Sequence, residues 1–335
     1  MYQNLHSHTK TSDGQLNYIQ NLDACKKYNI SVIAFTDHDA VPNEKAIKKL
    51  NGLKNHPTRW IIGCEISSGL PKEIGGPASN FHIVGLFVNP FNKNLKEHCK
   101  KAQEARIQRM KKIVKNLKSL GFNISEQDCL KQSAGETVGR VHIVEALKKK
   151  RKNLKIIENL RMKMKDKAKK DFKIQEKYKE MIKRGENQYP YSLFLEKKAF
   201  VPDIYVNYLY WKDMDQSVDL IRKAGGVAIL AHWTFSKNIV NEKMIGKFFE
   251  QKRLDGAEIV FGGDSSSNLK YVKKDMEIMK KLTERHKVLQ SGGIDSHAEK
   301  HLKWFSQQKW LAEKTIGMVE KMMKMRKLNL EFSSL

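Results

Sequence analysis

Residues 30–39 read ISVIAFTDHD, a β-branched apolar run that ends in polar and ionisable residues. This composition predicts a buried β-strand with chemically active side chains at its carboxyl end. The same form recurs five times, in RWIIGCEIS (59–67), FHIVGLFV (81–88), GGVAILAHW (225–233), LDGAEIVF (254–261) and KVLQSGGIDSH (287–297). Helical patterns separate several of these runs, the first from about Asn17 to Tyr28, so the sequence predicts an α/β fold of parallel β/α units.

The middle of the chain has a different pattern and predicts a helical module. Residues 94–120 are amphipathic and basic at helical spacing, and residues 141–184 are again helical and charged. Gly185 and NQYPYS end that stretch, and the strand-helix alternation resumes near AFVPDIYVNY. We therefore predict an α/β fold in residues 1–92 and 200–335, interrupted by a helical, lysine-rich insertion module in residues 93–199.

Metal-ligand side chains collect at the predicted strand ends. His6 and His8 alternate in LHSHTKTSDG (5–14), and two residues this far apart in a strand share a face. Taken alone, an H-x-H pattern more often indicates ordinary strand-end histidines than a pair of metal ligands. In sheets of parallel strands, however, functional residues gather at the carboxyl ends. Nine imidazole and carboxylate groups fall there: His6, His8, Asp13, His38, Glu65, His82, His232, Asp295 and His297.

This set predicts a cluster of two or three divalent metal ions. Mn²⁺, Zn²⁺ and Fe²⁺ accept mixed nitrogen and oxygen ligands, and a shared carboxylate can bridge two of them. The absence of a thiolate from the set favours an open hydrolytic site over a closed structural zinc site.

The charge of the chain points to an anionic substrate or partner. The 63 Lys and Arg residues outnumber the 37 Asp and Glu residues, which gives a net charge of +26. Residues 148–198 alone hold 19 Lys and Arg against 7 Asp and Glu, an excess of 12. This stretch is either a surface that follows a nucleic-acid backbone or a solvated helix, whose own core side is formed by Leu154, Ile157, Leu160 and Met164. The sequence does not decide between the two.

Length, cysteine usage and the N-terminal sequence bound the class of protein. A chain of 335 residues with 40% hydrophobic residues can build a substantial core. The four cysteines lack a C-x-x-C spacing, which indicates reduced structural thiols. No signal-peptide pattern follows Met1, and no run of about 18 apolar residues occurs, so we expect a cytoplasmic protein.

The ordered motifs LHSHTKTSDG, FTDHD, GCE, FHIVGL, AHW and GGIDSH resemble those of the PHP (polymerase and histidinol phosphatase) superfamily of metal-dependent phosphoesterases. The resemblance covers nearly the whole chain. It implies an irregular (β/α)7 barrel and is strongest to the branch of 3′,5′-nucleoside bisphosphate phosphatases and 5′-to-3′ exoribonucleases. The expected substrates are therefore phosphorylated nucleotides or short single-stranded RNA or DNA.

The resemblance also implies roles for individual residues. His6, His8, Glu65 and Asp295 would hold a first metal ion, and Glu65 would bridge to a second ion held by His82 and His232. Asp13, His38 and His297 would hold a third. In the GRVH motif, Arg140 would clamp the substrate phosphate, and His142 would contact or assist at the ester. Asp37 and Asp39 either orient the ligands or are simple strand-end residues.

Two departures from the branch bear on the substrate pocket. Glu145 replaces a second arginine three residues after the histidine of GRVH, and Trp233 of AHW replaces a proline, where it either stacks a base or packs internally. Two alternative functions remain, a small-molecule phosphatase unrelated to nucleic acid and a nucleic-acid-binding or assembly module with a non-catalytic PHP site. Retention of all nine ligand positions argues against the second.

Overall fold

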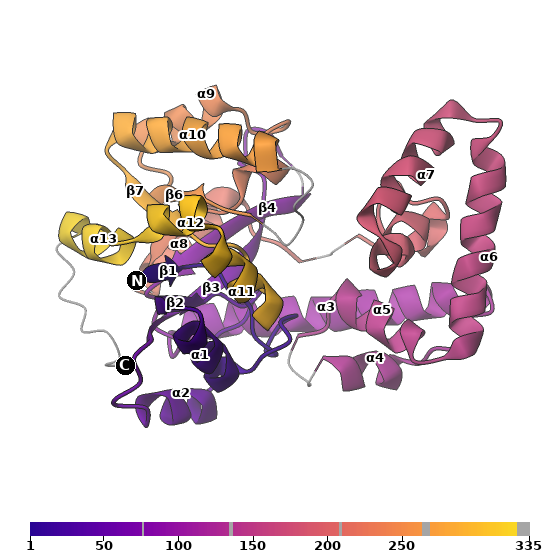
Figure 1. Ribbon diagram of the computed structural model, residues 1–335, viewed down its shortest axis with the longest axis horizontal. Coiled ribbons are helices and arrows are strands. Elements are labelled where there is room, and N and C mark those ends of the chain that lie inside the picture. The colour runs from indigo at the N-terminus through magenta and orange to yellow at the C-terminus, as the bar shows by residue number, and fades with distance from the viewer. Residues whose placement is uncertain (76, 134–136, 208–209, 263–268, 327–335) are drawn as a thin grey trace. The chain divides into compact units, whose positions relative to one another are not determined.

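The computed structural model describes residues 1–75, 77–133, 137–207, 210–262 and 269–326 (Figure 1). The chain forms two compact units. We call Met1–Ala102 together with Trp211–Leu335 the sheet unit, and Gln103–Tyr210 the helical unit. The division predicted from the sequence, with boundaries at 92/93 and 199/200, stays a prediction. No helix within the described residues is both long and apolar enough to cross a membrane.

The sheet unit contains one seven-stranded sheet whose strands neighbour one another in chain order. The strands are β1 (Tyr2–Asn4), β2 (Ile30–Phe35), β3 (Arg59–Gly69), β4 (Pro77–Leu86), β5 (Val227–Leu230), β6 (Gly256–Val260) and β7 (Leu289–Gly292). The helices around it are α1 (Tyr18–Lys27), α2 (Glu44–Asn51), α8 (Met214–Lys223), α9 (Glu242–Glu250), α10 (Leu269–His286), α11 (Glu299–Gln307), α12 (Lys309–Ala312) and α13 (Met318–Arg326) (Figure 1). The predicted α/β class is confirmed.

The strand directions correct one expectation. Four neighbouring pairs are parallel, but β4 runs antiparallel to both β3 and β5. Only residues 70–76 separate β3 from β4, which is too short for the crossover that two parallel strands need. As a result His82 lies within β4, opposite Ser67 of β3, and not at a carboxyl strand end.

The segments that follow β1 and β7 are tied to each other. The Leu5 amide donates to the Gly292 carbonyl at 3.0 Å, and the His8 amide donates to the Ser296 carbonyl at 2.8 Å. Ser7 and Ser296 form an isolated parallel bridge. These bonds place the two histidines after β1 beside the aspartate and the histidine after β7, although about 290 residues separate them in the chain.

The helical unit has its own hydrophobic core, which includes Leu117, Leu147 and Phe194. It is built from the later part of α3 (Lys93–Ser119), from α4 (Glu126–Gln132), α5 (Arg140–Lys148), α6 (Arg151–Ala168) and α7 (Phe172–Arg184), and from short turns at Glu186–Gln188, Tyr191–Leu195 and Pro202–Ile204. The predicted helix at 94–120 is confirmed. The stretch predicted as helical over 141–184 is three helices, because Lys150 and Asp171 are extended and start new ones.

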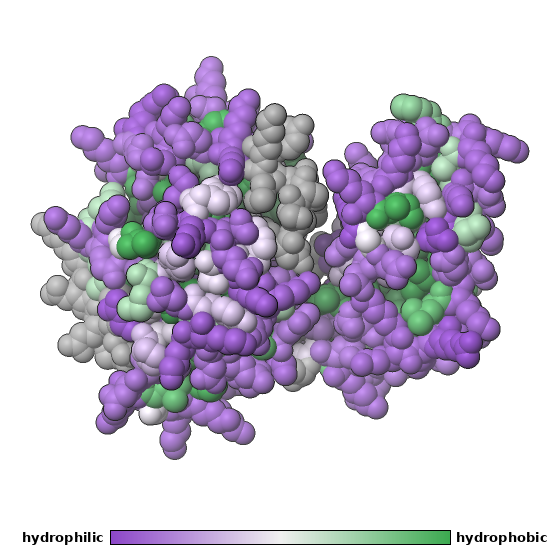
Figure 2. All heavy atoms as spheres, viewed as in Figure 1, coloured by the Kyte–Doolittle hydropathy of each residue, from purple (hydrophilic) through white to green (hydrophobic). Residues whose placement is uncertain are grey.

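Helix α6 has one buried face and one lysine-rich face. Ile157 and Met164 are buried and Leu160 is half-buried, as the sequence pattern predicts. The prediction is wrong for Leu154, which is 45% exposed, because the first turn of α6 points Asn153 inward, where it donates to the carbonyls of Asn123 and Leu147. Figure 2 shows a mainly hydrophilic surface over α6 and α7.

Candidate metal centre

All nine predicted ligand residues come together in the sheet unit, and we call them the ligand cluster. They form overlapping groups close enough to hold a metal ion: His8, Asp13, His38 and His297; His6, His8, Glu65 and Asp295; and His38, Glu65 and His82. The ninth residue, His232, joins through its Nε2, which lies 2.9 Å from Glu65 Oε1. The cluster therefore has the donor atoms that several neighbouring cations need, since each of the three groups offers at least three donor atoms.

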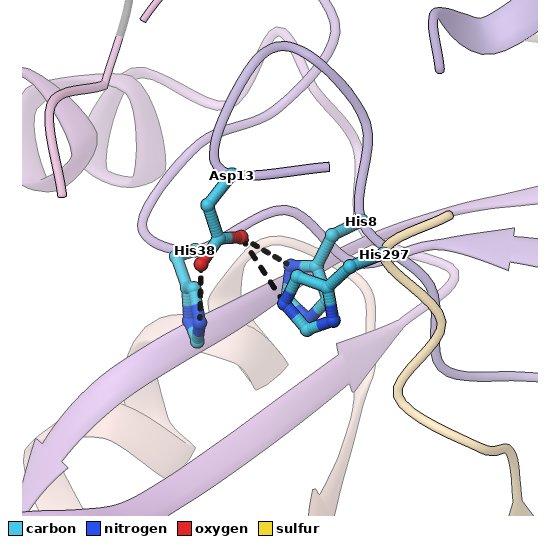
Figure 3. Close-up of side chains that lie close together, drawn as sticks. All are labelled: His8, Asp13, His38 and His297. Atoms are coloured by element: carbon cyan, nitrogen blue, oxygen red, sulfur yellow. Dashed lines mark ion pairs between the residues drawn. The ribbon is translucent and has the colours of Figure 1, made fainter. Parts of the chain in front are cut away.

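Asp13 links three histidines on one side of the cluster (Figure 3). Its Oδ1 lies 3.3 Å from His297 Nε2 and 3.6 Å from His8 Nδ1, and its Oδ2 lies 3.8 Å from His38 Nε2. The loop that carries Asp13 folds back closely at Gly14, where a Cβ atom would lie 2.3 Å from the His8 carbonyl oxygen. Only glycine allows this approach, which explains the glycine behind the aspartate in TSDG.

Glu65 occupies the middle of the ligand cluster and is fully buried. Its Oε1 lies 2.7 Å from His82 Nδ1 and 2.9 Å from His232 Nε2. Its Oε2 contacts three further imidazoles, at 2.9 to 3.3 Å: those of His38, His8 and His6. A carboxylate whose two oxygens face different sets of histidines has the arrangement that bridges two cations.

The electrostatics of the cluster are those of a buried charge network. Burial opposes ionisation of Glu65, but the surrounding histidines outweigh it and hold the pKa of Glu65 well below its usual range. Burial likewise disfavours charged His8, yet hydrogen bonds with Asp295 and Glu65 raise the pKa of His8 to about 10. Burial lowers the pKa of His82, and the attraction of Glu65 does not fully offset it. The buried carboxylates thus favour positive charge at His8, whereas His82 favours its neutral form, the form that binds a metal ion.

An orphaned atom shows that the donor set fits a bound cation. Among the described residues, the ring nitrogen Nδ1 of His232 in the cluster is buried and has no hydrogen-bond partner. Buried polar atoms normally find such partners. Two cluster residues also have a strained backbone, with φ of 27° at His232 and 52° at Asp295. Such conformations in non-glycine residues concentrate at functional sites.

Glu258 in β6 supports the ligand cluster, and the sequence analysis missed it. It is 2% exposed, and its Oε1 lies 2.7 Å from His6 Nδ1. Its Oε2 accepts the backbone N–H of His232 at 2.7 Å. A carboxylate on one ring nitrogen leaves the other nitrogen of His6 available as a metal ligand. The signal was present in the sequence, because GAEIV is an apolar strand with a single ionisable residue.

Asp37 and Asp39 both make buried hydrogen bonds near the cluster. The sequence predicted them either to orient the ligands or to be simple strand-end residues. Asp37 accepts from the Thr9 amide at 2.7 Å, from the Thr9 hydroxyl at 2.8 Å and from the Ser12 hydroxyl at 2.5 Å. Asp39 accepts from the Ser67 amide at 2.9 Å. Asp37 thereby fixes the loop between His8 and Asp13, and Asp39 fixes β3 next to Glu65.

The remaining predicted residues have structural contacts of their own. In the helical unit, Arg140 donates to the Leu195 carbonyl at 3.1 Å, and His142 Nδ1 accepts from the Gly139 amide at 2.8 Å at the start of α5. Glu145 pairs with Lys148 at 2.8 Å. In the sheet unit, Trp233 is 4% exposed and donates its ring N–H to the Val240 carbonyl, so it packs internally and does not stack on a base. The substrate contacts of Arg140 and His142 stay a prediction.

Two known proteins resemble this chain in sequence. The 3′,5′-nucleoside bisphosphate phosphatase of Chromobacterium violaceum is 22% identical over 299 residues, which are 88% of this chain and 86% of that protein. The 5′-3′ exoribonuclease Rnm of Salmonella typhimurium is 23% identical over 228 residues, which are 68% of this chain and 64% of that protein.

Two solved structures share the fold at low sequence identity. One is described as a metal-dependent phosphoesterase, from Bifidobacterium adolescentis, with a TM-score of 0.66 and 18% identity over 96% of this chain and 95% of that one. The other is an amidohydrolase of Chromobacterium violaceum with bound sulfate, with a TM-score of 0.61 and 20% identity over 89% of this chain and 88% of that one.

The family comparison confirms the resemblance that the motifs indicated. The PHP domain family matches residues 4–223, well over half of the chain. The match includes the histidines after β1, Asp13, His38 and the β3–β4 pair that carries Glu65 and His82. This protein belongs to the PHP domain family and is a metal-dependent phosphoesterase, a hydrolase of ester bonds.

Proposed function

We propose that this protein hydrolyses phosphate esters of nucleotides or of short single-stranded nucleic acids. The observation that carries the proposal is Glu65, a fully buried carboxylate that faces five histidines with its two oxygens. Such a network is costly to bury, because each charged group loses several kcal/mol, as an order of magnitude, of hydration free energy when it leaves water. A structural core does not need it, whereas a multinuclear hydrolytic site does.

The ligand cluster would hold two or three divalent ions, with Mn²⁺, Zn²⁺ or Fe²⁺ suited to its nitrogen and oxygen donors. We assign His6, His8, Glu65 and Asp295 to one ion, Glu65, His82 and His232 to a second, and Asp13, His38 and His297 to a third. When bound, such ions polarise the phosphoryl oxygens and supply a water deprotonated near neutral pH. The chain itself fixes the ligands through Glu258, Asp37 and Asp39 and needs no side-chain nucleophile.

The substrate class rests on the relatives and on charge. The similar proteins include a nucleoside bisphosphate phosphatase and an exoribonuclease. A net charge of +26 favours binding of a polyanion. In the helical unit, we assign Arg140 to the substrate phosphate and His142 to the ester. Glu145 takes the place of a second cation there, which favours substrates recognised through one phosphate at that end.

We also infer the finer architecture from strand contacts. The sheet runs from β1 to β7 in chain order, and the backbone bonds between the ends of β1 and β7 join its two edge strands. These contacts support an irregular (β/α)7 barrel with one reversed strand, β4. The helical unit would then be an insertion between β4 and β5.

The test is Mn²⁺-supported product release from 5′-phosphorylated RNA and DNA oligonucleotides, compared with 3′,5′-bisphosphoadenosine and with glycerol phosphate as a simple phosphate ester, for the wild type and for Asp295→Ala. We expect stepwise loss of 5′ nucleotides or release of phosphate, abolished by the substitution. Turnover of the bisphosphate alone would restrict the protein to mononucleotides. Turnover of simple phosphate esters alone would support a small-molecule phosphatase. No hydrolysis of any ester would contradict the proposal in favour of a binding module.

A further inference from the structure

An exposed aromatic ring lies beside the ligand cluster. Phe235 ends the short helix η4 (Trp233–Phe235), and its side chain is 61% exposed. Its ring centroid lies 5.4 Å from that of the cluster residue His232. Most of this large apolar side chain is left in contact with solvent, whereas Trp233, two residues earlier, is packed inside. The ring is therefore available to a ligand at the metal centre.

The loop that carries Phe235 is held at both ends. Trp233 donates its ring N–H to the Val240 carbonyl at 2.7 Å. Thr234 donates to Asp275 Oδ2 at 2.7 Å, and the Lys237 ammonium lies 2.7 and 2.9 Å from the two oxygens of Asp275, which is 3% exposed. These bonds fix residues on both sides of Phe235. A ligand that contacts the ring would not first have to order the loop, so little binding free energy would be lost.

We propose that Phe235 is a platform on which the nucleobase of the substrate stacks while the phosphate lies at the ligand cluster. This inference rests on the proposed function. A nucleotide carries its flat base one sugar away from the phosphate, and every base offers a π-face to an aromatic ring. Stacking of this kind tolerates different bases, because it does not read hydrogen-bonding groups. It would make the enzyme favour nucleotides over phosphate esters without a base.

Matched ligands can isolate the contribution of the ring. Calorimetry on the Mn²⁺-loaded protein would compare adenosine 5′-monophosphate with ribose 5-phosphate, which lacks only the base. We expect Phe235→Ala to weaken binding of the monophosphate by roughly 5- to 100-fold, the range for loss of one stacked base, and to leave ribose 5-phosphate unchanged. Phe235→Tyr keeps the ring and should bind both ligands like the wild type. Equal affinity of the wild type for the two ligands, or equal weakening of both by Phe235→Ala, would overturn the inference.

Turnover separates this inference from the proposed function. The substrates are 5′-phosphorylated trinucleotides with a normal or an abasic first nucleotide. Phe235→Ala should raise KM for the normal substrate, keep kcat within about twofold, and leave the abasic substrate unaffected. A wild type that hydrolyses both trinucleotides with the same KM would refute the stacking while the phosphoesterase function stands. If neither is hydrolysed, the proposed function fails, and the calorimetric comparison still decides the role of Phe235.

Discussion

The polar residues of the two units are arranged in opposite ways. In the sheet unit, the ligand cluster surrounds a carboxylate with no exposed surface, and its residues come from segments far apart in the chain. In the helical unit, many charged pairs lie within one helical turn and are solvated, as in Lys169–Asp166 at i,i+3, where both side chains are more than 60% exposed. Buried charges are costly and persist where they are used, whereas exposed charges cost little. The first arrangement therefore indicates a function by itself, and the second does not.

Removal of His8 should produce the largest effect, because His8 belongs to two of the three ligand groups. We expect His8→Ala to lower kcat/KM on the order of 1000-fold or more, since loss of an outer residue that merely orients a ligand already costs about 10- to 100-fold. Bound Mn²⁺, measured by elemental analysis after dialysis, should fall by at least one ion per chain.

His56 provides the matched control for that substitution. It lies in the same unit, outside the ligand cluster, and its Nε2 lies 3.7 Å from Asp23 Oδ1. His56→Ala should leave both metal content and turnover at the wild-type level. Equal losses in the two variants would mean that the cluster has no special role among the histidines.

Glu258 should have the next largest effect, although we do not expect it to touch the metal. Without its carboxylate, His6 loses the partner at Nδ1 and the His232 backbone loses its acceptor. Glu258→Ala should weaken Mn²⁺ binding by about 10- to 100-fold, and Glu258→Gln, which still accepts a hydrogen bond, should weaken it less. Competition with a metallochromic chelator would measure both. Identical losses in the two variants would show that the negative charge of Glu258, and not its hydrogen bonds, is what the metal centre requires, and no loss in either variant would contradict its role.

Most cluster positions could be predicted because they follow short apolar strands, whose pattern is local, although Glu65 and His82 lie within β3 and β4. The two-residue repeat of a strand is enough to predict that His6 and His8 share a face, and the end of an apolar run is enough to predict the positions of His38 and Asp295. The direction of β4 and the role of Glu258 depend on which strands pair and in which register, and no local pattern contains that. The exposure of Leu154 likewise depends on the long-range bonds that turn Asn153 inward, and the strained backbone of His232 depends on its contact with Glu258 of β6.

The exposed lysines of α6 should matter only for long substrates. We expect the combined change of Lys152, Lys155 and Lys163 to alanine to leave turnover of 3′,5′-bisphosphoadenosine unchanged and to weaken binding of single-stranded RNA. The slope of log K against log salt concentration should fall by about 2, since each lost contact to a single strand contributes about 0.7. Substitution of Lys26, Lys48 and Lys49 by alanine is the control, because these lysines are exposed on α1 and α2 and their loss changes the net charge by the same amount. Equal slopes in the two triple variants would mean that α6 is ordinary solvated surface.

The smallest effect should come from removal of a partly exposed ion pair in the helical unit. It shows how little such a pair contributes to stability compared with the buried network of the sheet unit. Lys150 donates to Asp128 at 2.6 Å, and this bond, with help from Ser125, lowers the pKa of Asp128 below 3.8. A lowered pKa means that the folded state binds the proton more weakly than the unfolded state does. The stabilisation is therefore present above about pH 4 and is lost as the pH falls through the folded-state pKa.

Asp128→Asn should reduce the free energy of unfolding by about 0.5–1 kcal/mol near neutral pH and by almost nothing near pH 2. Urea denaturation would measure the change in the free energy of unfolding at both pH values, and hydrogen exchange of the α4 amides would show whether the change is local to α4. Lys150→Met keeps the aliphatic stem and should give the same pH-dependent loss. A loss that is equal at both pH values would show that packing, and not charge, holds α4 against the start of α6. This partly exposed pair would then carry less electrostatic stabilisation than the buried network around Glu65, where removal of one partner leaves a charge without compensation.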